Sequence, residues 1–165
     1  QQGSKYFSGN LTPTAGYFVA DNLLIGTGVP LSLSQQRFTS YNTTKYTGTS
    51  AGLSPFVRYY IGKSSFKPYA GVSYSYAFTH NKYDLSSVFG TSLSGSGYST
   101  SFIPTIGVAY FINRTVALNA GLAYTVSNSK SGYISLANNV PTIVDSKSES
   151  KYASLDIGFQ IFFGK

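Results

Sequence analysis

Apolar and polar residues alternate with a period of two through much of this chain. In residues 53–61 the odd positions are Leu, Pro, Val, Tyr and Ile, and after a Gly-Lys-Ser-Ser turn the alternation resumes over 70–78. Such alternation on both sides of a short turn predicts a strand, a turn and a second strand. Each arm alternates over about ten residues, longer than the usual soluble strand of about five or six and near the length that crosses a bilayer.

The same phrase, a run that ends at aromatic residues and enters a tight turn, recurs along the chain. Short turns are expected at 20–22, 62–65 and 113–115, and they alternate with long polar connections at 36–45, 80–97 and 127–149 that are rich in turn and loop residues. Short turns on one side and long loops on the other are typical of an outer-membrane barrel. Seven strands are predicted, near 6–19, 23–36, 46–61, 67–80, 97–112, 116–128 and 150–163.

Each predicted strand has one apolar face, which we assign to lipid. This outward set comprises Leu11, Ala15, Tyr17, Val19, Leu23, Ile25, Val29, Leu31, Leu33, Leu53, Val57, Tyr59, Ile61, Ala70, Val72, Tyr74, Phe102, Ile106, Val108, Tyr110, Val116, Leu118, Ala120, Leu122, Tyr124, Leu155, Ile157, Phe159, Ile161 and Phe163. The inward set comprises Thr12, Thr14, Gly26, Gly28, Ser54, Arg58, Gly71, Ser73, Thr105, Gly107, Asn119, Gly121, Asp156, Gly158 and Gln160.

The two charges within the strand centres, Arg58 and Asp156, both fall on the inward set. An arginine facing lipid at mid-bilayer would cost about 2–4 kcal/mol, so this placement supports the assignment of faces. Three prolines, Pro13, Pro55 and Pro104, fall on the outward set. Because proline removes a ladder donor, we expect a bulge or a local break at each.

Aromatic residues gather near both ends of the predicted strands, as a pair of membrane-interface girdles would require. The girdle beside the short turns is represented by Tyr17, Tyr59, Tyr69, Tyr110 and Phe163.

Composition agrees with a membrane environment. The 165 residues suffice for one domain, 1–165, and charged residues are only 10%, against roughly 25% in soluble domains. Cysteine is absent, and no apolar run is long enough for a transmembrane helix. The net charge is +7, but the basic residues are scattered, so we expect contact with anionic lipid head groups and no nucleic-acid partner.

Catalytic, metal and cofactor sites are not predicted, and we expect no enzyme. His80 is the only histidine and has no cysteine or second histidine as a partner. The candidate polar residues of the lumen are Arg58, Asp156, Gln160 and Asn119. Arg58 and Asp156 either gate a small solute or form an internal ion pair that plugs a narrow barrel; we favour the plug, because about eight strands leave an interior that side chains fill.

The phrases PTAGYFVADNLLIGTGV (13–29), LSPFVRYYIG (53–62), FKPYAGVSYSY (66–76), PTIGVAYFINRTVALNAGLAYT (104–125) and LDIGFQIFF (155–163) resemble the small outer-membrane β-barrel domain family of Gram-negative bacteria, with an OmpA- or OmpX-like eight-stranded barrel. The resemblance implies an all-β, antiparallel, up-and-down transmembrane barrel in the outer membrane, with long loops extracellular and short turns periplasmic. Seven strands are found where eight are expected, and the expected opening strand is not readable. Either the sequence is incomplete or residues 1–10 contribute more than their pattern reveals, and the barrel is closed either by parallel pairing of the last strand with the first or by a strand-completing partner. The implied partners are outer-membrane lipid, lipopolysaccharide and other outer-membrane proteins.

The function we expect is structural, anchoring or surface-interacting, as a small integral outer-membrane protein or as a subunit of a larger membrane complex. Two alternatives stay open: a narrow pore or small-ligand-binding barrel, and a soluble lipocalin-like lipid binder whose apolar set would point inward.

Overall fold

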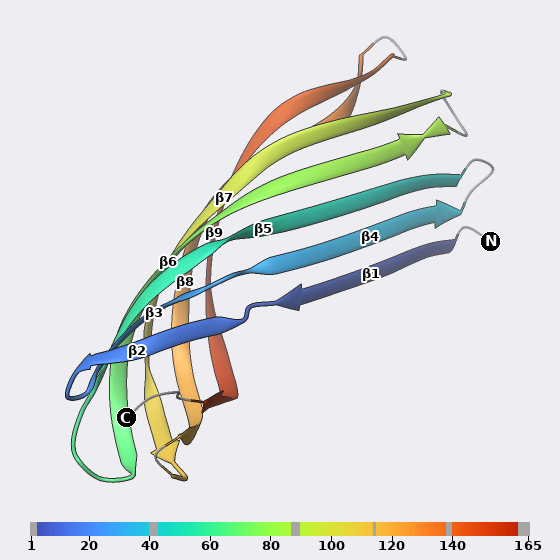
Figure 1. The fold of residues 1–165 in the computed structure, drawn as a ribbon. Helices are drawn as coiled ribbons and strands as arrows, with labels where there is room; N and C mark the ends of the chain where they lie inside the picture. The colour runs from blue at the N-terminus through green and yellow to red at the C-terminus, as the bar shows by residue number, and fades with distance from the viewer. Residues whose placement is uncertain (1–2, 40–42, 87–89, 114, 138–139, 162–165) are drawn as a thin grey trace.

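The computed structural model describes residues 3–39, 43–86, 90–113, 115–137 and 140–161. Within them, nine β-strands form one antiparallel sheet that curls into a half-barrel, as Figure 1 shows. The strands are β1 (Gly3–Leu11), β2 (Thr14–Ala20), β3 (Leu23–Gly28), β4 (Leu31–Thr39), β5 (Thr43–Tyr60), β6 (Phe66–Leu85), β7 (Thr91–Phe111), β8 (Val116–Ala137) and β9 (Val140–Ile161).

These nine segments occupy the seven strand positions that the alternation predicts. β1 and β2 together form the first position, and β3 and β4 form the second. The order across the sheet then follows the chain from β5 to β9, each strand pairing with its predecessor. β1–β2 and β9 are the two margins of the sheet, and no ladder joins them within the described residues.

Proline explains why two predicted strands are each divided. Pro13 separates β1 from β2, and Pro30 separates β3 from β4. The two divided strands stay hydrogen-bonded to each other between these prolines, because the Val29 amide donates to the Pro13 carbonyl at 2.9 Å. At Pro55 and Pro104 the ladders of β5 with β6 and of β7 with β8 lose pairs without a change of register. The predicted local breaks are therefore confirmed, without a bulge.

Tight turns close one end of the sheet, which we call the turn end (residues 20–23, 60–66 and 111–116; Figure 1). Positive φ angles at Asn22 (67°) and Gly62 (93°) bend two of them. In the third, the Asn113 side-chain oxygen accepts from the Thr115 amide and hydroxyl and from the Val116 amide, each at 2.8 Å. The three predicted turns are confirmed, with Arg114 of the third lying outside the described residues.

The opposite end, which we call the hairpin end, differs from the prediction of long loops. β6 continues to Leu85 and β7 begins at Thr91, while β8 continues to Ala137 and β9 begins at Val140. The predicted connections at 36–45, 80–97 and 127–149 are mostly strand. The Ser, Thr and Asn side chains described in them are at least partly exposed or form hydrogen bonds with other side chains, as Asn81 does with Tyr46, and backbone pairing does not require an apolar face.

The outward set lies on the convex face of the sheet, as predicted. Leu155, Ile157 and Phe159 are 67%, 72% and 76% exposed, and the large apolar residues of the other strand positions follow the same face. A buried cluster lies on the concave face near the turn end and consists of Leu24, Tyr60, Tyr69, Ala109 and Ala117. Among the described residues no helix is long and apolar enough to cross a membrane.

Candidate functional site

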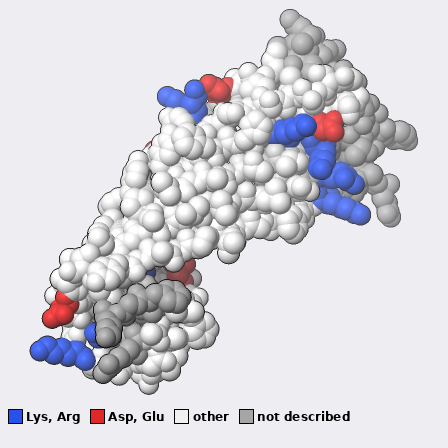
Figure 2. All heavy atoms as spheres, in the orientation of Figure 1, with Lys and Arg blue, Asp and Glu red and all other residues white. Residues whose placement is uncertain are grey.

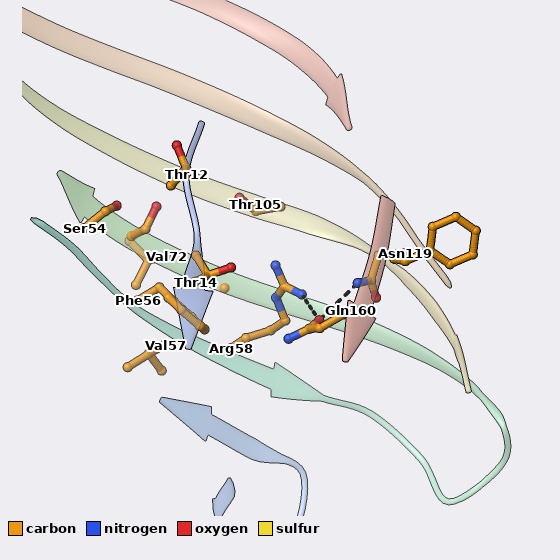
Figure 3. Close-up of a pocket in the computed structure, with 13 residues that line it drawn as sticks. Thr12, Thr14, Ser54, Phe56, Val57, Arg58, Val72, Thr105, Asn119 and Gln160 are labelled. Atoms are coloured by element: carbon orange, nitrogen blue, oxygen red, sulfur yellow. Dashed lines mark hydrogen bonds between the residues drawn. The ribbon is translucent and has the colours of Figure 1, made fainter. Parts of the chain in front are cut away.

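A cavity of about 320 Å³ lies on the concave face of the sheet, next to the buried cluster (Figure 3). Residues from both margins of the sheet line it, since Thr12 and Thr14 belong to the first strand position and Gln160 to β9. Nine members of the predicted inward set are in the lining: Thr12, Thr14, Ser54, Arg58, Gly71, Ser73, Thr105, Asn119 and Gln160.

Arg58 reaches into this cavity because it alternates with Val57 and Tyr59, whose side chains are exposed on the convex face. Its guanidinium Nη1 donates to Gln160 Oε1 at 3.0 Å, and Figure 3 shows the side chain directed toward β9. The guanidinium carbon also lies 4.3 Å from the centroid of the Tyr69 ring. An aromatic face stabilises a cation by a cation–π interaction, so the charge is held by neutral partners.

Gln160 Oε1 is the centre of a hydrogen-bond network that crosses the concave face. Besides Arg58, it accepts from the Tyr60 hydroxyl at 3.2 Å and from Asn119 Nδ2 at 3.0 Å. Arg58 Nη1 also contacts the Tyr60 hydroxyl at 3.4 Å. Since β5 and β9 are not neighbours in the sheet, these contacts join one side of the curl to the other.

Aromatic rings fill the concave face between this network and the turn end. The Tyr60 ring is fully buried, and its centroid lies 5.7–5.8 Å from those of Phe18, Tyr69 and Phe111. Such spacings are typical of tilted aromatic pairs.

Two glycines leave the space that the Tyr69 ring occupies. Gly107 and Gly121 are cross-strand partners on β7 and β8. A Cβ at Gly107 would meet the Tyr69 ring at 2.8 Å, and one at Gly121 would meet the Tyr69 hydroxyl at 2.5 Å. Larger residues at either position would displace the ring, so this glycine pair forms the floor under Tyr69.

Of the four residues predicted to be polar lumen candidates, the structure brings together Arg58, Gln160 and Asn119. The fourth, Asp156, lies opposite Gly121 in the ladder and is exposed. The ion pairs among the described residues are Lys130–Asp145 and Lys151–Glu149, so the expected Arg58–Asp156 pair does not form. A glutamine replaces the aspartate as the partner of Arg58.

The predicted interface aromatics have three different outcomes. Tyr17, Tyr59 and Tyr110 are exposed on the convex face, at 61%, 52% and 52%. Tyr69 is 5% exposed and lies on the concave face, so its assignment to a girdle was wrong. Phe163 lies outside the described residues.

The error at Tyr69 has a simple cause. Outward positions on β6 are even-numbered, as in Ala70, Val72 and Tyr74, so an odd-numbered residue must face inward. The same rule applies to Tyr60, which also belongs to the predicted girdle beside the short turns but is fully buried. In the pairs Tyr17–Phe18, Tyr59–Tyr60 and Tyr110–Phe111 the first ring faces out and the second faces in. Alternation alone was the signal that could have found the inner cluster.

The chemistry available in the cavity is that of hydroxyls, amides and one guanidinium. Within the described lining there is no carboxylate, imidazole or thiol that could serve as a general base. Asn119 Oδ1 is buried and accepts no hydrogen bond from the described residues. His80 lies in β6, not in a loop, and its ring nitrogen is 3.3 Å from the Ser96 hydroxyl. The arrangement can hold a polar or anionic group but offers no evident catalytic pair.

No protein-family model matches the chain, and no curated protein matches it in sequence. Among solved structures, the outer membrane protein OprG from Pseudomonas aeruginosa is similar over 98% of this chain and 82% of its own, with a TM-score of 0.57 and 16% identity. The siderophore receptor PiuA from Acinetobacter baumannii is similar over 96% of this chain and 30% of its own, with a TM-score of 0.47 and 12% identity.

The ferric yersiniabactin uptake receptor FyuA from Yersinia pestis is similar over 94% of this chain and 26% of its own, with a TM-score of 0.45 and 11% identity. The chain spans about a quarter to a third of the length of the receptors that it matches. The similarity to OprG shows the fold. The chain has the antiparallel fold of an outer-membrane β-barrel, as a curled half-barrel with an apolar convex face and a polar and aromatic concave face.

Proposed function

We propose that this chain is a small integral outer-membrane barrel protein, of the OmpA- or OmpX-like kind, that anchors in lipid and holds stiff hairpins beyond the membrane. In this proposal its role is structural or surface-interacting and not enzymatic. The hairpin end is extracellular and the turn end periplasmic. The observation that carries the proposal is the apolar convex face bounded by two rows of aromatic residues.

Those rows are cross-strand pairs on β6 and β7. Phe66 pairs with Tyr110 near the turn end, and Phe78 pairs with Tyr98 twelve residues further along β6. All four side chains are at least 40% exposed. Twelve steps of 3.3 Å, at the strand tilt of about 40° usual in such barrels, span about 30 Å along the membrane normal, which is the hydrocarbon thickness of a bilayer.

The soluble lipocalin-like alternative requires the apolar set to point inward. The structure places that set on the convex face and leaves Thr, Ser, Asn and Gln in the cavity, so this alternative is not carried forward.

We propose that one further strand closes the half-barrel. β1–β2 and β9 both run from the hairpin end to the turn end, so joining them directly would create a parallel ladder. A single strand running the other way pairs antiparallel with both margins and completes eight strands. Closure is required, because unpaired strand edges are not tolerated in lipid. Thr14 and Gln160 line the same cavity from the two margins, which is consistent with a narrow gap.

The closing strand can be tested with cysteines at the margins, since the chain has none of its own. Two strands that flank a third lie about 10 Å apart, and Cα atoms more than 7 Å apart cannot form a disulfide. We expect no direct disulfide between Asn10→Cys and cysteines placed singly at residues 152–156 in the protein extracted from membranes. A ready disulfide at any of them would show direct closure and contradict the proposal.

A non-conducting interior is the second part of the proposed role. The Tyr60 cluster and the Gln160 network fill the concave face at the turn end. In planar bilayers we expect the folded protein to show no steady single-channel current, and Tyr60→Ala with Gln160→Ala to produce discrete openings. Tyr133→Ala, at an exposed position of β8, is the matched control. Steady conductance by the unaltered protein would favour the alternative of a narrow pore.

The small-ligand alternative rests on one observation, the cavity with Arg58 in its wall. Its guanidinium carries a charge that no carboxylate of the described lining balances. If the protein binds a small anion there, Arg58→Gln abolishes the binding while the folded fraction in vesicles is kept.

A further inference from the structure

Three basic residues are direct neighbours on the convex face near the hairpin end. Lys5 on β1 lies opposite Arg37 on β4, and Arg37 lies opposite Lys45 on β5. Residues directly opposite in an antiparallel ladder have Cβ atoms about 5 Å apart, and like charges in that position destabilise the sheet. We call Lys5, Arg37 and Lys45, with Lys82 on β6, the basic row; Figure 2 shows basic side chains gathered at that end of the molecule.

One carboxylate lies beside the basic row. Asp84 is opposite Lys45 and shares the face of Lys82. Its Oδ1 accepts the Ser86 hydroxyl at 2.7 Å and the Ser86 amide at 3.1 Å, so its carboxylate is already hydrogen-bonded within its own turn. These bonds from Ser86, with a smaller contribution from Lys82 and Lys45, hold the pKa of the Asp84 carboxyl below its usual range. Four cations therefore share one carboxylate.

The other side of the same face is arranged differently. On β8 and β9, Lys130 Nζ lies 2.6 Å from Asp145 and Lys151 Nζ lies 2.7 Å from Glu149. Within the described residues the four cations of the basic row have no ion pair of this kind. On this face the four cations of the basic row have one carboxylate beside them, whereas Lys130, Lys147 and Lys151 have two, Asp145 and Glu149, both in ion pairs.

The position of the basic row relative to the apolar band indicates what neutralises it. Leu31 and Leu33 precede Arg37 on the same face of β4, and Phe78 precedes Lys82 by four residues on β6. Four residues at the usual tilt rise about 10 Å along the membrane normal, so Lys82 stands roughly one head-group layer beyond the aromatic row. Lys5, Arg37 and Lys82 are exposed and Lys45 is half-buried. Their ammonium and guanidinium groups are therefore available at the depth of lipid phosphates.

We propose that the basic row binds the phosphate groups of a bisphosphorylated lipid in the membrane leaflet at the hairpin end. The phosphates lie against Lys5, Arg37, Lys45 and Lys82, and the acyl chains lie along the leucines of β4. A lipid fits better than a soluble anion, because the charges adjoin an apolar surface on the same face. The inference rests on the proposed membrane insertion, so folding is verified before binding is measured.

The test uses the full chain folded in a neutral detergent and titrated with fluorescent bisphosphorylated lipid A. The row variant carries Lys5→Gln, Arg37→Gln and Lys45→Gln. The matched control carries Lys130→Gln, Lys147→Gln and Lys151→Gln, which removes the same charge from β8 and β9, where two of the three lysines are ion-paired. Each basic residue near an anionic surface contributes roughly fivefold, so we expect the row variant to bind on the order of 100-fold more weakly and the control less than about fivefold.

Equal losses in the two triple variants would show a general effect of net charge and overturn the inference. Competition by inorganic phosphate at concentrations equal to those of the lipid would show a free-anion site and also overturn it. Asp84→Asn keeps the test decisive if the row variant does not fold: removing the single carboxylate should strengthen binding several-fold, and unchanged or weaker binding contradicts the proposal. Failure to insert into vesicles at all is a separate result, which counts against the proposed function.

Discussion

The two ends of β6 differ in the polarity of their side chains and in what those side chains contact. From Phe66 to Phe78 its outward side chains are apolar or aromatic, and its inward neighbours on other strands are rings and glycines. From Thr79 to Asp84 it carries polar residues on both faces, and its inward residues Asn81 and Tyr83 make hydrogen bonds beside one ring contact of Tyr83 with Tyr46. One strand thus passes from an apolar level of the sheet to a polar level without a change in backbone pairing.

The interior at the hairpin end combines polar contacts with a ring pair, Tyr46 and Tyr83, whose centroids lie 5.1 Å apart. Tyr46 donates to Asn81 Oδ1 at 3.0 Å, and Tyr83 donates to the Gly132 carbonyl at 3.4 Å. Burial, followed by the nearby Tyr46 phenol, raises the pKa of the Tyr83 phenol above its ordinary value. The comparison shows that pairing of the backbone fixes the shape of the sheet, while the side chains decide which solvent each level meets.

The largest effect should follow from a charge on the convex face between the two aromatic rows. We expect Ile106→Arg, on β7 between Tyr98 and Tyr110, to prevent folding into lipid vesicles, because an arginine facing lipid near mid-bilayer costs about 2–4 kcal/mol. Ser94→Arg, on the same face of β7 but four residues beyond Tyr98, should fold normally. Heat-dependent mobility on gels measures the folded fraction. Equal folding of the two variants would remove the distinction between the two levels.

The next effect concerns the buried ring at the turn end. Tyr60→Ala removes a side chain with no exposed surface from a cluster of three other rings, so a loss of about 3 kcal/mol is expected. Tyr133→Ala, at a 45% exposed position of the hairpin end, should change stability by less than about 0.5 kcal/mol. Urea unfolding in vesicles gives both values. A similar loss in both would mean that the two ends are packed alike.

A smaller effect is expected from Gln160→Leu. The change removes the acceptor shared by Arg58, Tyr60 and Asn119, and leaving donors without a partner costs about 1–3 kcal/mol. Gln160→Glu should keep the acceptor and be much milder, because a carboxylate also pairs with the guanidinium. If urea unfolding finds the two variants equally unstable, the network does not stabilise the curl.

The smallest effect concerns an exposed ion pair at the hairpin end. Lys151 lowers the pKa of the Glu149 carboxyl, so the stabilisation by this pair is present above the ordinary pKa of glutamate and is lost as the pH falls through the lowered folded-state pKa. Glu149→Gln should remove this part of the pH dependence with little change at pH 7. A large loss of folding stability at pH 7 would contradict the view that exposed ion pairs stabilise the hairpin end only weakly.

Much of the sheet could be predicted from the sequence. The alternation gives the seven strand positions, the faces and the three turns, because the direction of a strand side chain is set by its own backbone. The predicted long loops were wrong because Ser and Thr content reports contact with water and not the loss of pairing. The inward position of Tyr69 could also have been predicted, because odd-numbered residues of β6 lie on the other face of the strand from Val72.

The sequence by itself determined which side of each strand is apolar and faces outward and which faces the interior. Only the tertiary structure decided which side chains contact one another across that interior. The ladders place Arg58 in one row with Ser154, two residues from Asp156 and six from Gln160, yet Gln160 is its partner. The reason is that strands cross the curl at a tilt, so residues that face each other through the interior are displaced along the strands from those that share a row.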